Sequence, residues 1–412
     1  MSGWLRRVSE ELSFIRGNVL ILLVSWAMLY LGWYASFTYF SLYVLELGGT
    51  PFTVGLVNAA YCLAYASVQF LGGYIADSYG RRKIIVTMTF ALACSYLMFV
   101  LAPTWKILLV GAVVEGVSLI YTPAIYAMLA DSLPPEKRGL GYSLTILATA
   151  PSVAAPFLAS AFVSRMGVLR GMRLLYAVLV AICLAAALLR IGLRETLSGG
   201  RSVNPLQALK AYPDAVREGF RVWSSVPKEA LWLSVVYVTS YSLTWLCSPY
   251  YVIYATEELG ISEELWAVLM SVNLVFLYLP SIPVGKLVDV VGRVKPLIAS
   301  MAFMMASSIM FIMGGIPLLA SSLALSGMAS TLFATAYQSL QTDLVPAECR
   351  GRVIGFTEFF TYIFTAFGGL FGGYLYQNVS PKLPFITLAL AQVPLIAIAS
   401  TTLRRVEDTR GD

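Results

Sequence analysis

One carboxylate, Glu115, lies well inside a long apolar stretch that runs from about residue 107 to residue 130. If that stretch crosses a membrane as a helix, Glu115 lies roughly 12 Å from the nearer edge, at about 1.5 Å per residue. An ionisable group at this depth is costly and usually faces a cavity or a partner. Two interpretations stay open. Glu115 exchanges protons or contacts a solute, or it is a permanently protonated or hydrogen-bonded group that fixes helix packing.

The chain offers no set of side chains for covalent or metal chemistry. It contains no histidine, and its five cysteines are scattered singly, so a metal cluster or a disulfide framework is not indicated. Gly285-Lys286 is not a phosphate loop, because Pro280 stands where its first glycine should be and Leu287 replaces Ser or Thr. We therefore predict a protein that is not an enzyme, with no catalytic residue, no metal and no cofactor. The expected coupling ion is a proton.

Aromatic and amide side chains recur inside the apolar stretches. Aromatic stripes at helical spacing more often pack than bind, but Trp and Tyr near the middle of a span indicate a partly polar lumen. Intramembrane amides either bond between helices or meet a solute. The candidates for the wall of a cavity are Tyr30, Trp33, Tyr34, Asn58, Tyr241, Trp245, Asn273 and Gln338.

A charged motif occurs twice, at the same distance in each half of the chain. Residues 73 to 83 read GYIADSYGRRK, and residues 285 to 295, which lie 212 positions later, read GKLVDVVGRVK. A second pattern, from Asp131 to Arg138, returns from Asp343 to Arg350 at the same offset. The repeated residues are Gly73, Asp77, Gly80, Arg81, Asp131 and Arg138 in the first copy, and Gly285, Asp289, Gly292, Arg293, Asp343 and Arg350 in the second. The repeat predicts two similar halves.

These repeated charges are candidates for a gate on one face of the protein. A carboxylate there can accept hydrogen bonds from the amino end of a neighbouring helix, and the glycines let helices approach closely. Contacts that form in one conformation and break in another would act as a two-state latch. The alternative is that they are ordinary loop charges that set topology. Glu358 lies a few residues inside a later apolar stretch, and we expect it to join this network through Arg81 or Arg352 rather than to bind cargo.

The composition is that of a membrane protein. The chain is 58% hydrophobic and 12% charged, with a mean hydropathy of +0.77, whereas soluble domains carry about 25% charged residues. A membrane helix needs roughly 20 apolar residues. Runs of that kind are found at 18–46, 52–76, 84–102, 107–130, 142–164, 174–193, 229–255, 264–288, 296–313, 318–342, 354–376 and 385–403. Prolines such as Pro280 and Pro283 are expected to bend these helices.

Six runs precede a polar stretch and six follow it. We predict an N-terminal six-helix bundle at 1–193, a cytoplasmic linker with a short surface helix at 194–228, and a C-terminal six-helix bundle at 229–412. Most of the 28 Lys and Arg residues fall in the termini, the linker and the connections on that same side, which predicts that both termini are cytoplasmic. Because the cations alternate with apolar spans, the net charge of +6 does not indicate nucleic acid as a partner.

A chain of twelve spans with G-x-x-x-D-x-x-G-R-x-K after spans two and eight resembles the major facilitator superfamily (MFS) of transporters. Asp131 to Arg138 is similar to the family's acidic-x6-arginine element. The resemblance implies an all-α membrane protein of two pseudo-symmetric six-helix bundles that rock around a central cavity. Two family features are missing. Ala112 stands where many members carry an arginine, and Ala150-Pro151 lacks the flanking glycines of many antiporters.

Taken together, these observations predict a secondary active transporter of a small organic solute, which works by alternating access and is coupled to protons through Glu115. Efflux of a drug or metabolite is one form of this function. An uncoupled facilitator and a non-transporting receptor or sensor on the same scaffold are the alternatives. With no intramembrane arginine evident, a neutral, cationic or amphipathic cargo is favoured over an anionic one. We expect a monomer in the lipid bilayer of the plasma membrane.

Overall fold

The structure is a computed structural model that describes residues 14–134, 137–197 and 226–403, together with residues 217 and 221. It is helical throughout this part of the chain. The predicted surface helix in the linker lies outside the described residues. The first half consists of α2 (Asn18–Phe37), α3 (Phe40–Glu46), α4 (Pro51–Tyr79), α5 (Arg81–Leu101), α6 (Trp105–Ser118), η1 (Leu119–Tyr121), α7 (Thr122–Ser132), α8 (Arg138–Thr149), η3 (Ala150–Ala154) and α9 (Ala155–Ile191).

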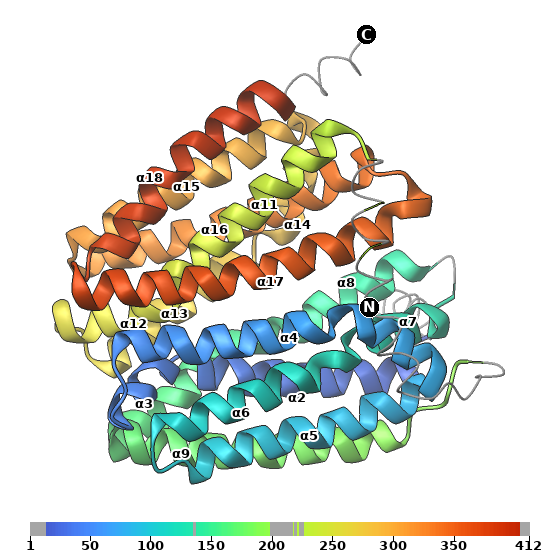
Figure 1. The fold of residues 1–412 in the computed structure, drawn as a ribbon, viewed down its shortest axis with the longest axis horizontal. Helices are drawn as coiled ribbons and strands as arrows, with labels where there is room; N and C mark the ends of the chain where they lie inside the picture. The colour runs from blue at the N-terminus through green and yellow to red at the C-terminus, as the bar shows by residue number, and fades with distance from the viewer. Residues whose placement is uncertain (1–13, 135–136, 198–216, 218–220, 222–225, 404–412) are drawn as a thin grey trace, which may run out of the picture.

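The second half repeats this plan. Its elements are α11 (Lys228–Cys247), η4 (Ser248–Tyr250), α12 (Tyr251–Ile253), η5 (Tyr254–Glu258), α13 (Glu263–Tyr278), α14 (Ser281–Val291), α15 (Val294–Met313), α16 (Ile316–Leu344), α17 (Ala347–Asn378), α18 (Leu383–Ile398) and η6 (Ala399–Leu403). The two halves lie side by side, with the first in blue and green and the second in yellow to red (Figure 1).

Ten helices in the described residues are long and apolar enough to cross a membrane, and α13 with α14 make an eleventh if the bent pair counts as one span. One of the ten, Leu147–Ile191, has 45 residues, which is about twice what one crossing needs. Its backbone is not helical at Gly167, where φ is 75° and ψ is 163°. Counted as two crossings, this segment would give the predicted twelve. The protein is therefore an integral membrane protein.

Several predicted spans are interrupted rather than continuous. The span predicted at 18–46 breaks between α2 and α3, at Thr38 and Tyr39. The span predicted at 264–288 bends by 45° between α13 and α14, where Pro280 stands. The span predicted at 107–130 passes through η1. Proline lacks a backbone donor, which accounts for the second break.

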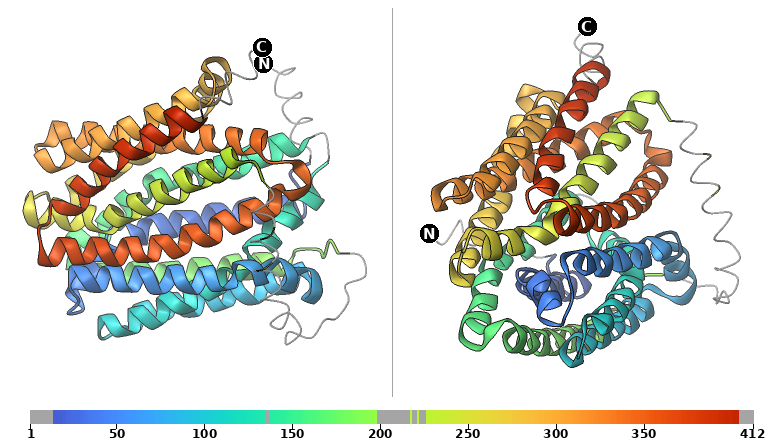
Figure 2. Two further views of the ribbon diagram at one scale, coloured as in Figure 1. Left: turned by 45° about the horizontal axis from the view of Figure 1, so that its top comes forward. Right: turned by 60° about the vertical axis from the view of Figure 1, so that its left-hand side comes forward.

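The boundary between the halves is formed in part by α4 and α17, which lie along each other in all three views (Figures 1 and 2). Glycines allow this close approach. A Cβ atom on Gly55 would meet the Gly369 carbonyl oxygen, and one on Gly373 would lie 2.9 Å from the Phe52 Cα. Tyr250 donates its hydroxyl hydrogen to the Gly369 carbonyl at 2.7 Å, which ties this junction to α17.

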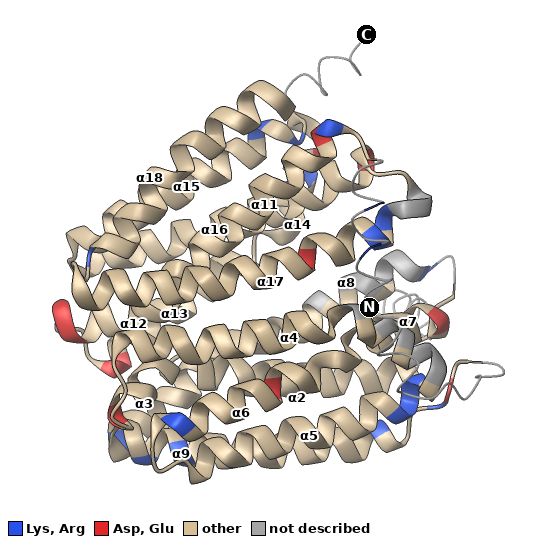
Figure 3. Ribbon diagram, viewed as in Figure 1, with Lys and Arg blue, Asp and Glu red and all other residues tan. Residues whose placement is uncertain are grey.

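The two ends of the bundle differ. Lys and Arg gather near the helix ends, and the middle is almost uncharged (Figure 3). We call the end where α2 begins and η6 finishes the ion-pair end, because the pairs Arg81–Asp131 and Arg293–Asp343 lie there. The other end, which holds Gly48 and Gly260, is the opposite end. In Figure 1 the helices of the two halves spread apart toward the ion-pair end, on the right.

Candidate functional site

A central cavity of about 390 Å³ lies between the two halves. Twelve of its lining residues are Trp or Tyr, namely Trp26, Tyr30, Trp33, Tyr34, Tyr61, Tyr65, Tyr96, Tyr121, Tyr126, Tyr241, Trp245 and Tyr362. Most of the wall comes from α2, α4, α5, η1 and α7 of the first half, with Glu115 from α6, and the second half closes it with α11 and α17. The volume falls in the range of sites that hold small organic molecules.

Two smaller cavities adjoin this one. A cavity of about 70 Å³ shares Trp33, Tyr61, Glu115 and Trp245 with the central cavity. A cavity of about 170 Å³ shares Tyr34 with it, and its wall is richer in serine and threonine. Because they share lining residues, the three cavities adjoin one another and form one polar and aromatic region inside the bundle.

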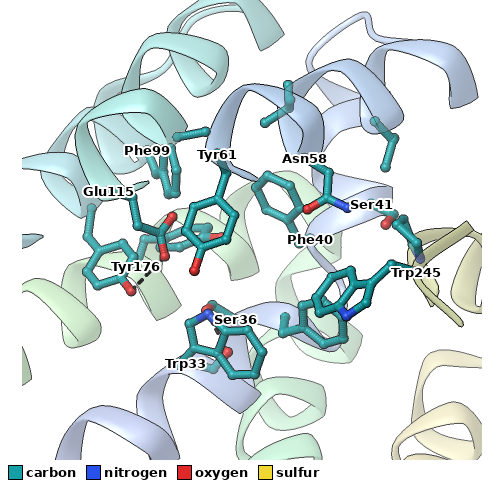
Figure 4. A pocket seen from close by; sticks show the side chains of 16 residues that line it. Trp33, Ser36, Phe40, Ser41, Asn58, Tyr61, Phe99, Glu115, Tyr176 and Trp245 are labelled. Carbon is teal, nitrogen blue, oxygen red and sulfur yellow. Dashed lines mark hydrogen bonds between the residues drawn. The ribbon is translucent and has the colours of Figure 1, made fainter. Parts of the chain in front are cut away.

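Glu115 faces this space. Its side chain is buried, and it lines both the central cavity and the 70 Å³ cavity. The Tyr96 hydroxyl donates a hydrogen bond to Glu115 Oε1 at 3.1 Å. No arginine or lysine is paired with this carboxylate in the described part of the chain. Figure 4 shows Glu115 beside Tyr61, with Trp33 across from them. A carboxylate in this setting can take up a proton or meet a cationic group.

The aromatic wall joins the two halves. Phe37 stacks on Trp33 at 5.1 Å between ring centroids and meets Trp245 of the second half edge-on at 5.8 Å. Tyr65 and Tyr362 form a second cross-half pair at 4.5 Å. Because the faces of such rings attract cations, this wall suits a solute with an apolar body and a positive charge.

Most of the predicted cavity residues lie at these walls. Tyr30, Trp33, Tyr34, Tyr241 and Trp245 line the central cavity. Asn58 lines the 70 Å³ cavity, and Asn273 lines the 170 Å³ cavity, where its Nδ2 donates to the Leu323 carbonyl at 2.9 Å. Gln338 on α16 is different, because it is exposed and lines none of these three cavities.

Glu358 lies in α17 and is half-buried. The hydrogen bond to its Oε1 comes from the Tyr237 hydroxyl at 3.0 Å, not from Arg81 or Arg352 as the sequence led us to expect. Tyr237 in turn stacks on Tyr337 at 4.0 Å, so this carboxylate is anchored within the second half. Helix packing rather than loop charge therefore decides its partner.

The repeated charges form the same ion pair in each half. Arg81 pairs with Asp131, and Arg293 pairs with Asp343, both at the ion-pair end. The neighbouring motif glycines share an unusual backbone, with φ of 101° at Gly80 and 92° at Gly292. Residues with a Cβ atom rarely adopt such φ angles, which explains the need for glycine at both positions.

Other gate candidates do not join these pairs in the part of the chain that the structure describes. Asp289 is exposed and has no hydrogen-bond or ion-pair partner there. Arg350 donates to the Thr342 and Val345 carbonyls at 2.8 and 3.3 Å, and so caps the end of α16. A Cβ atom on Gly285 would meet nothing within 4 Å, so the close helix approach expected there is not present.

The surroundings of three gate candidates lie outside what the structure describes. Gly73, Asp77 and Arg138 are placed within their helices, but the contacts of their side chains are not described. A carboxylate does lie at the amino end of α5, and it belongs to Glu195. Its Oε2 accepts from the Arg82 backbone N–H at 3.0 Å, where the helix dipole favours negative charge. No sequence pattern singles out Glu195, because a contact across more than 100 residues leaves no local signal.

Arg190 is a second residue that no sequence pattern marks. It lies in the apolar run predicted at 174–193, near the linker and its cations, yet its side chain is fully buried inside the first half. Its Nε donates to Ser25 Oγ at 3.1 Å, and its Nη1 donates to Thr89 Oγ1 at 2.7 Å. The guanidinium lies 5.2 Å from the centroid of the Tyr121 ring. The expectation that the membrane part holds no arginine is therefore wrong.

The opposite end is closed by contacts between the halves. The Tyr39 hydroxyl donates to the Glu263 carbonyl at 2.5 Å, and the Trp266 indole N–H donates to the Thr38 carbonyl at 3.3 Å. Both rings are buried. The backbone N–H of Phe52 also reaches across, to Gln377 Oε1 at 3.0 Å. At this end the halves are thus joined where α2, α3 and α13 meet and where the start of α4 lies beside the end of α17.

A helical membrane bundle of two similar halves around a central cavity defines the class of membrane transport proteins. The family model described as Major Facilitator Superfamily matches residues 22–247 and 233–411, and the chain belongs to this superfamily. The prediction of an MFS secondary transporter with an all-α membrane fold, made from the sequence, is confirmed.

Individual relatives share only part of the sequence. The chain is 32% identical over 219 residues to "Putative metabolite transport protein YncC" of Bacillus subtilis, which covers 49% of this chain and 45% of that one. It is 24% identical over 365 residues to "Uncharacterized MFS-type transporter MJ1317" of Methanocaldococcus jannaschii, covering 83% and 84%. A crystal structure of a peptide transporter POT in complex with sulfate superimposes with a TM-score of 0.77 at 13% identity, over 94% of each chain. At that identity the likeness concerns the fold alone.

Proposed function

We propose that this protein is a secondary active transporter that moves a small organic solute by alternating access, with protons as the coupling ion and Glu115 as the residue that carries them. The observation behind the proposal is that one buried carboxylate lies in the wall of the central cavity, with a tyrosine as its hydrogen-bond donor. Such a group is costly in a membrane interior unless it has a task or a partner.

The arrangement of the halves supports alternating access. The hydrogen bonds described above between the halves lie toward the opposite end, while the helices spread toward the ion-pair end (Figure 1). We assign this arrangement to a state whose cavity opens toward the ion-pair end. By the distribution of Lys and Arg, that end faces the cytoplasm. We place the protein in the plasma membrane as part of this proposal. Opening the other way would break the contacts of Tyr39, Trp266 and Phe52.

The cavity chemistry supports a cargo with an aromatic or otherwise apolar body. Its wall is mostly tyrosine and tryptophan, which offer ring faces and hydroxyl groups with few full charges. The name of the YncC relative, a metabolite transport protein, is in line with a small organic cargo. The uncoupled facilitator remains the competing function, with Glu115 as a structural group.

The test is solute flux in proteoliposomes with and without an imposed pH gradient, across a panel of aromatic amines, neutral aromatics and nucleosides. We expect accumulation driven by the gradient in the wild type and its loss in Glu115→Gln, with counterflow exchange retained. Glu46→Gln, an exposed carboxylate at the opposite end, is the matched control and should behave as the wild type. Full gradient-driven accumulation by Glu115→Gln would reject the coupling role. Wild-type flux that ignores the gradient would establish the facilitator.

A further inference from the structure

Arg190 is held in an unusual position for a charged side chain. It belongs to the last turn of α9, yet none of its surface is exposed. Side chains in a helix point back toward the amino end, so an arginine in the last turn reaches into the bundle rather than out of it. Ser25 and Thr89 are fully buried as well, and each donates its own hydroxyl hydrogen to a carbonyl of its helix. Their oxygens are therefore oriented to accept from Arg190.

These contacts leave the guanidinium incompletely satisfied. Two of its three nitrogens have hydrogen-bond partners, while Nη2 is buried and has none in the described part of the chain. The contacts described for Arg190 include no carboxylate. The carbonyls at the end of α9 and the face of the Tyr121 ring supply partial negative charge only. A buried cation of this kind normally has an anionic partner.

Arg190 lies directly behind the wall of the central cavity. Tyr121 lines that cavity and also lies against the guanidinium. Trp26, next to Ser25, and Leu92, one turn from Thr89, line the same cavity. Tyr121 is therefore in contact with both the solute space and the guanidinium group of Arg190.

The backbone that carries this ring is interrupted. Tyr121 ends η1, a 3-10 turn between α6 and α7, and Pro123 follows without a backbone N–H. The Leu119 carbonyl, which a regular helix would pair with residue 123, accepts from the Thr122 hydroxyl at 2.7 Å instead. Short 3-10 stretches inside a helix are frequent sites of hinge motion, and proline adds to this. A small shift of η1 would move the Tyr121 ring and connect Nη2 with the cavity.

We propose that Arg190 is an anion-binding residue of the central cavity, covered by Tyr121, and that it binds a carboxylate, phosphate or sulfonate group when η1 shifts. A charge-assisted hydrogen bond from Nη2 would hold the anionic group. With Glu115 in another part of the wall, the cavity then has one site for each sign of charge, which suits a zwitterionic or anionic aromatic solute. This inference rests on the central cavity being the solute space, as proposed above, but it can be tested without measuring transport.

The test is the rate at which phenylglyoxal labels Arg190 in the full chain in phosphatidylcholine nanodiscs, read by peptide mass spectrometry. Arg173, which donates to the Ala102 carbonyl at the opposite end, is the internal reference. Benzoate and benzylamine are the two protectants, because they share a ring and differ in charge. We expect benzoate to slow labelling of Arg190 at least fivefold and saturably, benzylamine to change it less than twofold, and neither to affect Arg173.

Variants of the cover test its role. Tyr121→Ala should raise the labelling rate of Arg190 at least fivefold, whereas Tyr121→Phe, which keeps the ring, should stay within twofold of the wild type. If Tyr121→Ala does not fold, as judged by size-exclusion chromatography, the benzoate comparison in the wild type and in Tyr121→Phe decides alone. Equal protection by benzoate and benzylamine, or an Arg190 that stays unlabelled in folded Tyr121→Ala, would overturn the proposal.

A lipid headgroup offers the same chemistry as a solute anion, and a further arm separates the two. Nanodiscs with one fifth phosphatidylglycerol should leave Arg190 labelling unchanged in the absence of benzoate. Slower labelling there, with no added effect of benzoate, would assign the residue to a headgroup and reject the solute site. Loss of proton coupling in Glu115→Gln would not alter any of these rates, so the two proposals can fail separately.

Discussion

At the junction of α4 and α17 the two halves pack closely, and a single substitution there should have a predictable effect on stability. Gly55→Ala adds one carbon, and at the present backbone positions that carbon would overlap the Gly369 carbonyl oxygen and lie 2.6 Å from the Tyr250 hydroxyl oxygen. Carbonyl oxygens cannot turn aside as flexible side chains do, so one of the two helices must move. Gly355 on α17 is the matched control, because a Cβ atom there meets nothing within 4 Å.

The magnitude follows from two opposing terms. Replacing a glycine inside a helix by alanine favours the helix by about 1 kcal/mol, and both variants gain this. Overpacking a tight contact costs about 1–3 kcal/mol, and only Gly55→Ala meets that cost. The free energy of unfolding of the two variants should therefore differ by about 1–3 kcal/mol, with Gly55→Ala the less stable, which is roughly a 5- to 150-fold difference in the folded–unfolded equilibrium.

The assay is reversible unfolding in mixed micelles with increasing dodecyl sulfate, followed by tryptophan fluorescence. Counterflow exchange in proteoliposomes is measured in parallel, because a forced separation of α4 and α17 changes the boundary on which the halves move. We expect Gly55→Ala to lose exchange and Gly355→Ala to keep it. If the two variants unfold at the same concentration and exchange at the same rate, the close packing at Gly55 is not a feature of the protein.

Two further predictions concern the ends of the bundle. Asp131→Asn and Asp343→Asn should each lower the free energy of unfolding by less than about 1 kcal/mol, because these carboxylates are 44% and 20% exposed. Each variant should nevertheless slow solute exchange severalfold if the pairs order the gate. Unchanged exchange in both variants would show that they are surface charges without a role in gating. Trp266→Phe removes the indole donor to Thr38 and should favour opening of the opposite end. This is read as faster labelling of a Ser41→Cys reporter, which is buried, by an impermeant maleimide than in the reporter alone. Slower or equal labelling would contradict a closing role for that bond.

The parts of the structure that the sequence predicted best are those encoded by a repeat. Two copies of one motif at a fixed distance require two copies of one local geometry. The structure has them in the pairs Arg81–Asp131 and Arg293–Asp343. It has them again in the positive φ of Gly80 and Gly292, which no other residue type adopts without strain. The positions of the membrane spans could also be predicted, because a run of apolar residues of membrane length has few other uses.

The hydrogen-bond partners of buried polar groups could not be predicted from such patterns. Arg190 looked like a residue flanking the linker, since it stands three residues before the end of the apolar run predicted at 174–193 and close to several other cations. Its direction depends on the helix that carries it, and its acceptors, Ser25 and Thr89, lie more than 100 residues away. Glu358 was similarly assigned by its distance from a helix end, although Tyr237 decides its contact. Packing between helices carries this information, and a single sequence does not display it.

The position of the ion pairs changes what the proposed latch must consist of. Arg81 and Asp131 both belong to the first half, and Arg293 and Asp343 both belong to the second. If each half moves as a rigid body, contacts within a half persist through the cycle and cannot report which end is open. Contacts between the halves must break instead, and those of Tyr39, Trp266 and Phe52 are of this kind. A latch built on the paired arginines therefore requires that a half deforms, whereas the contacts at the opposite end switch by rocking alone. The Trp266→Phe and Asp131→Asn variants separate these two mechanisms, because the first alters the balance between end states and the second alters the rigidity of one half.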